Sequence, residues 1–494
     1  MTPKNAPEHL VNRPLERYQT AGRILGPVVF AAMLATDQWQ DVMDPHAWRT
    51  AAVGLWMAIW WATEAIPVPV TAFLPIVVLE PLGVATIREA AAPYANPIIY
   101  LFLGGFLMAL ALERWSLHRR IALAILDRTG TDGRRLIGGF MFVCATLSMW
   151  MTNTTTTIML LPIVLSVTGV ILDNVPDLSE KRRNDFQIAM LLGLAYSASI
   201  GGLATLVGTP PNALLIGYLA ENYNIDISFA RWMLVGVPVS AVMLPIAWFI
   251  LTRLLHPVSI PANEAVRRHL HRMRAEMGPM TTPEKRVAVI FCLVILSWIL
   301  RRPLIDLTGL AGISDAGIVM TAGVLLFLLP SGSAAEPQLM TWRDTARLPW
   351  GVLVLFGGGL SLAAAVSNSG LALWLGESLA PLNSFGIAVL VIASVALVIF
   401  LTELTSNTAT TATFLPVVGA IAIESGFDPI TVTVPVTFAA SCAFMLPVAT
   451  PPNAIVFGSG MLTIPKMARA GFLLNLVGIG VVSLAALYLA PRFL

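Results

Sequence analysis

Charge is scarce in this chain of 494 residues. Charged residues make up 12% of the sequence, whereas typical soluble proteins carry roughly 25%. Hydrophobic residues make up 56%, and apolar segments of membrane-spanning length recur from Ala21 to the C-terminus. The composition excludes an array of soluble domains and predicts an all-α polytopic membrane protein.

Cysteine and histidine are also rare, with three and six residues. The cysteines lie in apolar stretches without metal-ligand spacing, as expected of small buried residues. No basic tract with interleaved aromatic residues indicates nucleic acid as a partner. An intramembrane enzyme would need an activated nucleophile or a metal, and no constellation of residues supplies either. We therefore expect no enzyme activity.

The few basic residues are unevenly distributed. They cluster at 117–135, 179–184 and 267–286, whereas the connections at 37–46, 221–226 and 424–429 are acidic or neutral. Because cytoplasmic loops are enriched in Lys and Arg, we expect a cytoplasmic N-terminus, a periplasmic or extracellular C-terminus and about eleven transmembrane helices. Arg301 and Arg302 do not fit this pattern. The absence of long loops favours a bacterial inner membrane.

Two apolar segments must enter and leave on the same side of the membrane. The segment 136–170 has basic residues before and after it, so it is predicted to be a re-entrant hairpin with its middle near Asn153. The equivalent segment at about 385–421 is expected to enter from the other side.

The sequence repeats itself across a hydrophilic linker. LFLGGF at Leu101 matches LFGGGL at Leu355, and TNTTTTIMLLPIV at Thr152 matches SNTATTATFLPVV at Ser406, both with an offset of 254. GTPPNALLIG at Gly208 matches ATPPNAIVFG at Ala449 with an offset of 241. An odd number of spans per half would make the two halves inverted-topology repeats, which are common in secondary transporters.

This reading divides the chain into six parts. They are a cytoplasmic N-terminal segment (1–22), scaffold and interfacial helices of repeat 1 (23–133), the transport part of repeat 1 (134–255), a cytoplasmic linker (256–286), scaffold and interfacial helices of repeat 2 (287–383), and the transport part of repeat 2 (384–494).

The TPPN sequences predict broken helices at membrane depth. Two consecutive prolines remove backbone donors and interrupt the helical hydrogen bonds, which frees carbonyl groups on one half-helix and exposes N–H groups on the other. Free carbonyls suit Na+, and helix N-termini suit carboxylates. Ser and Thr also serve in membrane helices for close packing alone. The repetition of both motifs in both halves favours a binding site.

These paired motifs, together with TEAIPVPVTAFLPI at Thr63, resemble the divalent anion/sodium symporter family over nearly the whole chain after the first twenty residues. The resemblance implies a scaffold domain, a transport domain that moves in an elevator-type cycle, and a homodimer formed through scaffold helices. It also implies Na+ as the co-transported ion, with no organic cofactor.

The resemblance places two Na+ sites and a substrate site. The first Na+ site would use Ser148, Met151, Asn153 and Gly208, and the second Thr402, Thr405, Asn407 and Ala449. The substrate carboxylates would bind Asn153, Thr154, Thr209, Ser406, Asn407, Thr408, Thr450 and Pro451. Thr152 departs from the family pattern, which has Ser there, and leaves the substrate preference open.

We therefore expect Na+-coupled uptake of C4-dicarboxylates such as succinate, fumarate or malate. The motif segments contain no Lys or Arg, so two Na+ would offset the charge of a dianion. A dicarboxylate exchanger and a Na+-coupled citrate or sulfate transporter remain as alternatives. Glu403, three residues before Ser406, is expected to brace the hairpin rather than to couple protons.

Overall fold

The computed structural model describes residues 17–175, 178–310, 312–333, 336–379 and 386–494. The expected cytoplasmic segment 1–22 lies outside the described residues up to residue 16, and its last residues begin the first helix. Within the described ranges, the secondary structure is helical apart from one isolated bridge between Pro330 and Gln338. The expected all-α class is confirmed.

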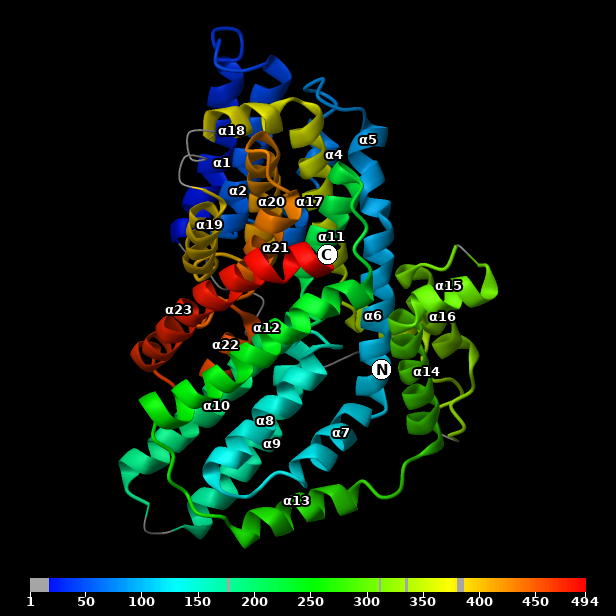
Figure 1. Cartoon of the computed structure of the whole chain (residues 1–494), viewed down its shortest axis with the longest axis vertical. Coiled ribbons are helices and arrows are strands. Elements are labelled where there is room, and N and C mark those ends of the chain that lie inside the picture. The colour runs from blue at the N-terminus through cyan, green and yellow to red at the C-terminus, as the bar shows by residue number, and fades with distance from the viewer. Residues whose placement is uncertain (1–16, 176–177, 311, 334–335, 380–385) are drawn as a thin grey trace, which may run out of the picture.

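The first half of the chain contains the helices from α1 to η3, most of which are labelled in Figure 1. They are α1 (Arg17–Ala35), α2 (Pro45–Thr63), α3 (Val68–Thr71), α4 (Leu74–Val78), α5 (Ile87–Ala91), η2 (Ala92–Ala95), α6 (Pro97–Arg114), α7 (Leu117–Leu126), α8 (Gly133–Ser148), α9 (Asn153–Asn174), α10 (Glu180–Gly202), α11 (Pro210–Tyr223), α12 (Phe229–Phe249) and η3 (Ile250–Leu255).

The second half begins after a linker helix, α13 (Glu264–Glu276). It contains α14 (Thr282–Ile299), α15 (Arg301–Thr308), α16 (Asp315–Leu328), η4 (Trp342–Arg347), α17 (Trp350–Asn368), α18 (Leu371–Leu379), α19 (Ile387–Thr402), α20 (Asn407–Glu424), α21 (Pro429–Ala440), α22 (Pro451–Phe457), α23 (Ile464–Tyr488) and α24 (Ala490–Phe493).

Helix starts follow local sequence signals. Asp44 caps α2, with its carboxylate accepting a hydrogen bond from the His46 N–H at 2.8 Å, and Pro45 takes the first helical position. Thr281 and Glu284 form a capping box at the start of α14. Such caps satisfy the free N–H groups that every helix start exposes.

Five helices in the described ranges are long and apolar enough to cross a membrane, or six if the bent pair α14–α15 counts as one span. Shorter apolar helices cover Val68–Val78, Asp315–Leu328, Ile387–Thr402 and Pro429–Ala440. The expectation of about eleven spans also counts segments that form short or interrupted helices here.

The bend of 79° between α14 and α15 lies next to Arg301, one of the two arginines that did not fit the charge pattern. The Arg301 guanidinium lies 3.1 Å from the Asp315 carboxylate and 3.7 Å from that of Asp226. The two carboxylates neutralise the charge of Arg301 locally, which explains how this arginine fits on the side assigned to acidic loops.

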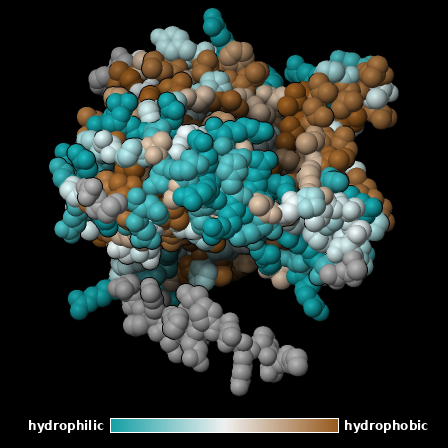
Figure 2. Space-filling model, turned by 90° about the horizontal axis from the view of Figure 1, so that it is seen from below, coloured by the Kyte–Doolittle hydropathy of each residue, from teal (hydrophilic) through white to brown (hydrophobic). Residues whose placement is uncertain are grey.

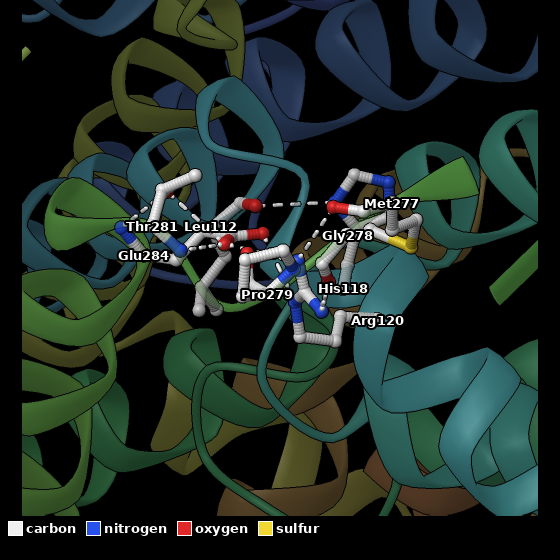
Figure 3. A network of polar contacts seen from close by, with 8 residues as sticks. All are labelled: Leu112, His118, Arg120, Met277, Gly278, Pro279, Thr281 and Glu284. Atoms are coloured by element: carbon white, nitrogen blue, oxygen red, sulfur yellow. Dashed lines mark hydrogen bonds and ion pairs between the residues drawn. The ribbon is translucent and has the colours of Figure 1, made fainter. Parts of the chain in front are cut away.

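The short helix α7 is tied to the start of α14, far away in the sequence. The Arg120 guanidinium donates to both carboxylate oxygens of Glu284 at 3.1 Å and to the carbonyls of Met277, Gly278 and Pro279 (Figure 3). Burial lowers the pKa of the nearby His118 imidazole, which lies 3.1 Å from the Leu112 carbonyl. These contacts fix α7 relative to α14.

The linker helix α13 crosses one end of the molecule and contacts both α7 and α9 (Figure 1). Seen from below, this end presents a broad hydrophilic band with apolar surface beside it (Figure 2). Arg267, Arg268 and Arg272 of α13 are exposed. A polar end and apolar flanks are the distribution expected of a protein whose sides face lipid.

Candidate functional site

The first polar motif forms the turn between two packed helices. The helix α8 ends at Ser148 and α9 begins at Asn153, so the turn covers residues 149–152. Thr152 caps α9 by accepting a hydrogen bond from the Thr155 N–H at 3.2 Å. The polar residues that stood out in the sequence are therefore the helix start at the tip of a hairpin.

The first TPPN motif breaks a helix, as expected. The helix α10 ends at Gly202, α11 begins at Pro210, and the residues between them, 203–209, are all buried. The Asn212 amide donates to the Gly202 carbonyl at 3.2 Å and to the Thr205 carbonyl at 2.8 Å. The asparagine of the motif thereby satisfies carbonyls that the break has freed.

Oxygen atoms converge where the hairpin tip meets this break. The Asn153 Oδ1 lies 2.7 Å from the Ser148 hydroxyl, 3.0 Å from the Ala198 carbonyl and 3.3 Å from the Gly208 carbonyl. An amide oxygen among other acceptors is stabilised by a bound cation or by a 180° rotation of the amide, which would place its N–H groups there. In that rotated orientation the NH2 group of Asn153 donates to the Ser148 hydroxyl and to the Ala198 and Gly208 carbonyls, so these contacts are satisfied without a cation.

Glycines permit this close approach. A Cβ atom on Gly202 would lie 2.5 Å from Asn153 Oδ1, and a Cβ on Gly208 would lie 2.4 Å from the Gly202 carbonyl oxygen. Any side chain at either position would displace the Asn153 amide or the Gly202 backbone. The sequence analysis indicated Gly208 only as an expected ligand of the first Na+ site, and it did not indicate Gly202 or Ala198.

The second hairpin repeats this arrangement. The Thr402 hydroxyl lies 2.9 Å from Asn407 Oδ1 and donates to the Ala440 carbonyl at 2.9 Å, as Ser148 does with Asn153 and the Ala198 carbonyl. The tip covers residues 403–406, and α20 begins at Asn407. The sequence repeat with an offset of 254 is therefore also a repeat of hydrogen bonds.

The second break repeats the first as well. The helix α21 ends at Ala440, α22 begins at Pro451, and the Asn453 amide donates to the Ala443 carbonyl at 3.2 Å and the Leu446 carbonyl at 3.0 Å. Thr450 caps α22 by accepting from the Asn453 N–H at 3.3 Å. Both asparagines of the TPPN motifs act as clamps, a role that the sequence alone did not reveal.

The remaining expected residues lie on these same tips and breaks. Met151, Thr209, Thr408, Ala449 and Thr450 are buried, whereas Pro451 is exposed. Thr154 and Ser406 are partly buried at the helix starts of α9 and α20. Thr405 shares a hydrogen bond of 2.6 Å with Thr410. Each predicted Na+ set therefore lies at one tip and one break, whereas the predicted substrate set lies at both tips and both breaks.

The two halves contact each other around these motifs. The helix α22 of the second half packs against α9 and α10, and α11 of the first half packs against α20 and α21. Among the described residues, no group of three or more His, Cys, Asp or Glu could hold a metal ion. The oxygens offered to a cation come from amides, hydroxyls and carbonyls, which are hard neutral ligands.

Comparison with known proteins finds similarity along nearly the whole chain. The sequence profile of the sodium:sulfate symporter transmembrane region matches residues 19–491. A sodium-dependent dicarboxylate transporter, SdcS, of Staphylococcus saprophyticus is 39% identical over 486 residues, which cover 96% of this chain and 92% of that protein. SdcS of Staphylococcus aureus strain USA300 is 39% identical over 490 residues, which cover 97% and 92%.

A solved structure supports the fold alone. The crystal structure of the YdaH transporter of Alcanivorax borkumensis matches with a TM-score of 0.57 at 14% sequence identity. The match covers 88% of this chain and 98% of that one. Similarity thus extends along nearly the full chain in both sequence and fold.

Proposed function

This chain belongs to the sodium:sulfate symporter family of divalent anion/sodium symporters, and from that premise we propose that it couples Na+ to the uptake of C4-dicarboxylates. Succinate, fumarate and malate are the substrates we expect. Transport would run across a bacterial inner membrane, with the N-terminus in the cytoplasm and the C-terminus in the periplasm. The curated relatives carry the name of sodium-dependent dicarboxylate transporters.

The observation that carries this proposal is the paired cluster of oxygen acceptors. In each half, a hydroxyl group lies within hydrogen-bond distance of an asparagine oxygen and of a backbone carbonyl: Ser148 contacts Asn153 and Ala198, and Thr402 contacts Asn407 and Ala440. In the first cluster, Ser148, Asn153 and Gly208 would hold one Na+, with Met151 adding its carbonyl. In the second, Thr402, Thr405, Asn407 and Ala449 would hold another.

The helix starts beside these clusters suit the carboxylates of the substrate. The first N–H groups of α9, α11, α20 and α22 have no carbonyl partner within their own helices. Anions are stabilised at such helix N-termini. Side chains at these starts would donate further hydrogen bonds. Asn153, Thr154, Thr209, Ser406, Asn407, Thr408 and Thr450 would contact the substrate by hydrogen bonds. Pro451 would contact it by packing.

The architecture we propose is two inverted repeats of about eleven spans with two re-entrant hairpins. The transport part would comprise 134–255 and 384–494, the scaffold 23–133 and 287–383, and the linker 256–286. The transport part would move past the scaffold in an elevator-type cycle, and two copies would associate through scaffold helices. The contacts of α22 with α9, and of α11 with α20, support a transport part built from both halves.

Purified protein in proteoliposomes tests the function. An inward Na+ gradient should drive net uptake of labelled succinate into vesicles that contain no dicarboxylate, and choline in place of Na+ should abolish it. Asn153→Ala and Asn407→Ala should reduce uptake more than tenfold while the protein remains folded. Uptake that persists in choline would refute Na+ coupling.

The same vesicles separate the alternatives. An exchanger would take up label only when the lumen is loaded with dicarboxylate, whatever the Na+ gradient. A citrate or sulfate transporter would leave succinate uptake low, and a panel of unlabelled anions would show which one competes.

A further inference from the structure

Glu403 lies at the tip of the second hairpin, and its carboxylate has four hydrogen-bond donors. The Phe444 and Met445 N–H groups donate to Oε1 at 2.8 and 2.9 Å, and the Leu446 N–H donates to Oε2 at 3.0 Å. The Asn475 amide of α23 adds a fourth bond at 2.8 Å. Three successive backbone N–H groups form a concave anion site, which here holds a carboxylate of the protein itself.

The first half has no such anchor. The residue equivalent to Glu403 at the offset of 254 is Met149, which carries no acceptor on its side chain suited to this role. In the first half, a side chain of the break bonds to the backbone of the tip, because the Thr205 hydroxyl donates to the Met149 carbonyl. In the second half, the backbone of the break donates to a side chain of the tip. The two halves therefore join hairpin to break by different chemistry.

The two breaks also differ in exposure. Every residue of the first break, 203–209, is buried, so the surrounding helices hold it in place. In the second break Val448 is 80% exposed, and Leu404 of the facing tip is 68% exposed. Packing leaves the second break partly uncovered, whereas Glu403 is only 3% exposed and contacts it from the inside.

Leu446 connects the Glu403 carboxylate to the proposed second cation site. Its N–H donates to Glu403, and its carbonyl accepts from the Asn453 amide at 3.0 Å and from the Ala449 N–H at 3.3 Å. Ala449 is the residue whose carbonyl would bind the second Na+. The break is thus held on its N–H side by Glu403 and on its carbonyl side by Asn453.

We propose that Glu403 is a positioning residue that holds the second break in the geometry required for the second Na+ site. This inference rests on the proposed function and deepens it, because it makes the two Na+ sites unequal. The first is held by packing and a hydroxyl group, the second by a buried carboxylate. Loss of that carboxylate should weaken Na+ binding without removing any Na+ ligand.

Glu403→Gln is the central variant. A glutamine retains one acceptor oxygen but places an NH2 group against at least one of the three backbone N–H groups. In proteoliposomes, the Na+ concentration for half-maximal succinate uptake should rise about tenfold, while the maximal rate at saturating Na+ stays within about twofold of the wild type. A general folding defect would lower the maximal rate and leave the Na+ dependence unchanged.

Two further variants complete the design. Asn475→Leu removes one donor while it keeps the number and branching of the side-chain heavy atoms, and should raise the half-maximal Na+ concentration about threefold. This variant tests the proposal even if Glu403→Gln does not fold. Glu377→Gln makes the same chemical change at an exposed residue of α18 and should leave transport unchanged.

Hydrogen exchange provides a readout that does not depend on transport. In the purified protein, the amides of residues 444–446 should exchange at least tenfold faster in Glu403→Gln than in the wild type, whereas those of 203–205 should not change. If the wild type fails to transport succinate but this pattern holds, the substrate assignment is wrong and the anchor stands. Unchanged exchange together with unchanged Na+ dependence would overturn the proposal.

Discussion

At the scale of single residues, Gly202 leaves no room for a side chain beside Asn153. A Cβ atom there would lie 2.5 Å from Asn153 Oδ1 and 3.2 Å from Cγ. We expect Gly202→Ala to rotate or displace the Asn153 amide, to raise the Na+ requirement for uptake about tenfold or more, and to cost about 1–3 kcal/mol of stability through overpacking. Uptake as a function of Na+ concentration measures the first effect.

Gly169→Ala is the matched control for this change. Gly169 lies on α9, the helix that begins at Asn153, and a Cβ atom there would meet nothing within 4 Å. Alanine should be neutral or stabilise the helix by about 0.5–1 kcal/mol. A wild-type Na+ dependence in Gly202→Ala would show that Asn153 does not bind the ion in this geometry.

The sequence predicted much of the site at this scale because its motifs are local. A polar helix start at Asn153 and a proline break at Pro210 can be recognised from neighbouring residues alone. The carbonyl of Ala198 and the clearance at Gly202 could not be predicted, because both depend on how α8 approaches α10. The clamp by Asn212 likewise depends on the turn that the break adopts.

At the scale of helices, two glycines let α12 and α23 contact the backbone of the first and the second break, respectively. A Cβ on Gly236 of α12 would lie 2.6 Å from the Leu203 carbonyl oxygen, and a Cβ on Gly471 of α23 would lie 2.2 Å from that of Phe444. We expect Gly236→Ala and Gly471→Ala to lower the melting temperature by several degrees, because backbone atoms cannot yield as a side chain can.

Gly480→Ala serves as the control for Gly471→Ala, since it lies on the same helix with nothing within 4 Å of its Cβ. Differential scanning fluorimetry of the purified proteins would compare the three variants. If Gly471→Ala melts like Gly480→Ala, the contact between α23 and the break contributes no measurable stability.

The attachment of α7 to α14 yields a second prediction at this scale. The side chain of Glu284 is 5% exposed, and Arg120 is its cationic partner. Removing the arginine takes away the cationic partner of a buried carboxylate, which keeps only its hydrogen bonds from Thr281, and one donor to three carbonyls, so Arg120→Ala should cost about 2–4 kcal/mol. Arg128→Ala, which removes an exposed arginine just after α7, should have no effect.

Thermal unfolding with and without Na+ would test the Arg120 pair. A stability loss in Arg120→Ala that matches Arg128→Ala would contradict a structural role for it. The sequence did not predict this pair, because Arg120 and Glu284 lie 164 residues apart and only the fold brings them together.

At the scale of the whole molecule, an aromatic cluster attaches the first hairpin tip to α14. The ring of Trp150 lies 5.5 Å from Phe291, 6.0 Å from Phe229 and 6.4 Å from Trp298, as centroid distances. Trp150 belongs to the proposed transport part, and Phe291 and Trp298 to the proposed scaffold. An elevator-type cycle would have to break the contacts between these rings and form them again.

We therefore expect Trp150→Ala to destabilise this state relative to others. Distances between spin labels on α9 and α14 should broaden toward a second population, and the rate of uptake should change by severalfold. Trp39→Ala, which removes an 81% exposed ring, should do neither. A single unbroadened distance in Trp150→Ala would indicate that the tip and α14 do not separate.

Topology was predictable from the sequence only in outline. The charge distribution and the repeats predicted two related halves with a linker, and family membership is confirmed. Only five or six helices in the described ranges, however, are long and apolar enough to cross a membrane, because other expected spans are short or broken. Arg301 could be reconciled with the charge pattern only once its partners Asp226 and Asp315 were known.

The linker helix α13 sets a geometric limit on any such cycle. It contacts Ser166 of α9 through His269 at 2.9 Å and Asp127, just beyond α7, through His271 at 3.2 Å. It continues into α14 through residues 277–281 and is reached from η3 through 256–263. An extended chain advances only about 3.3–3.6 Å per residue, so the lengths of these two connecting segments limit how far the proposed transport part could move relative to the proposed scaffold.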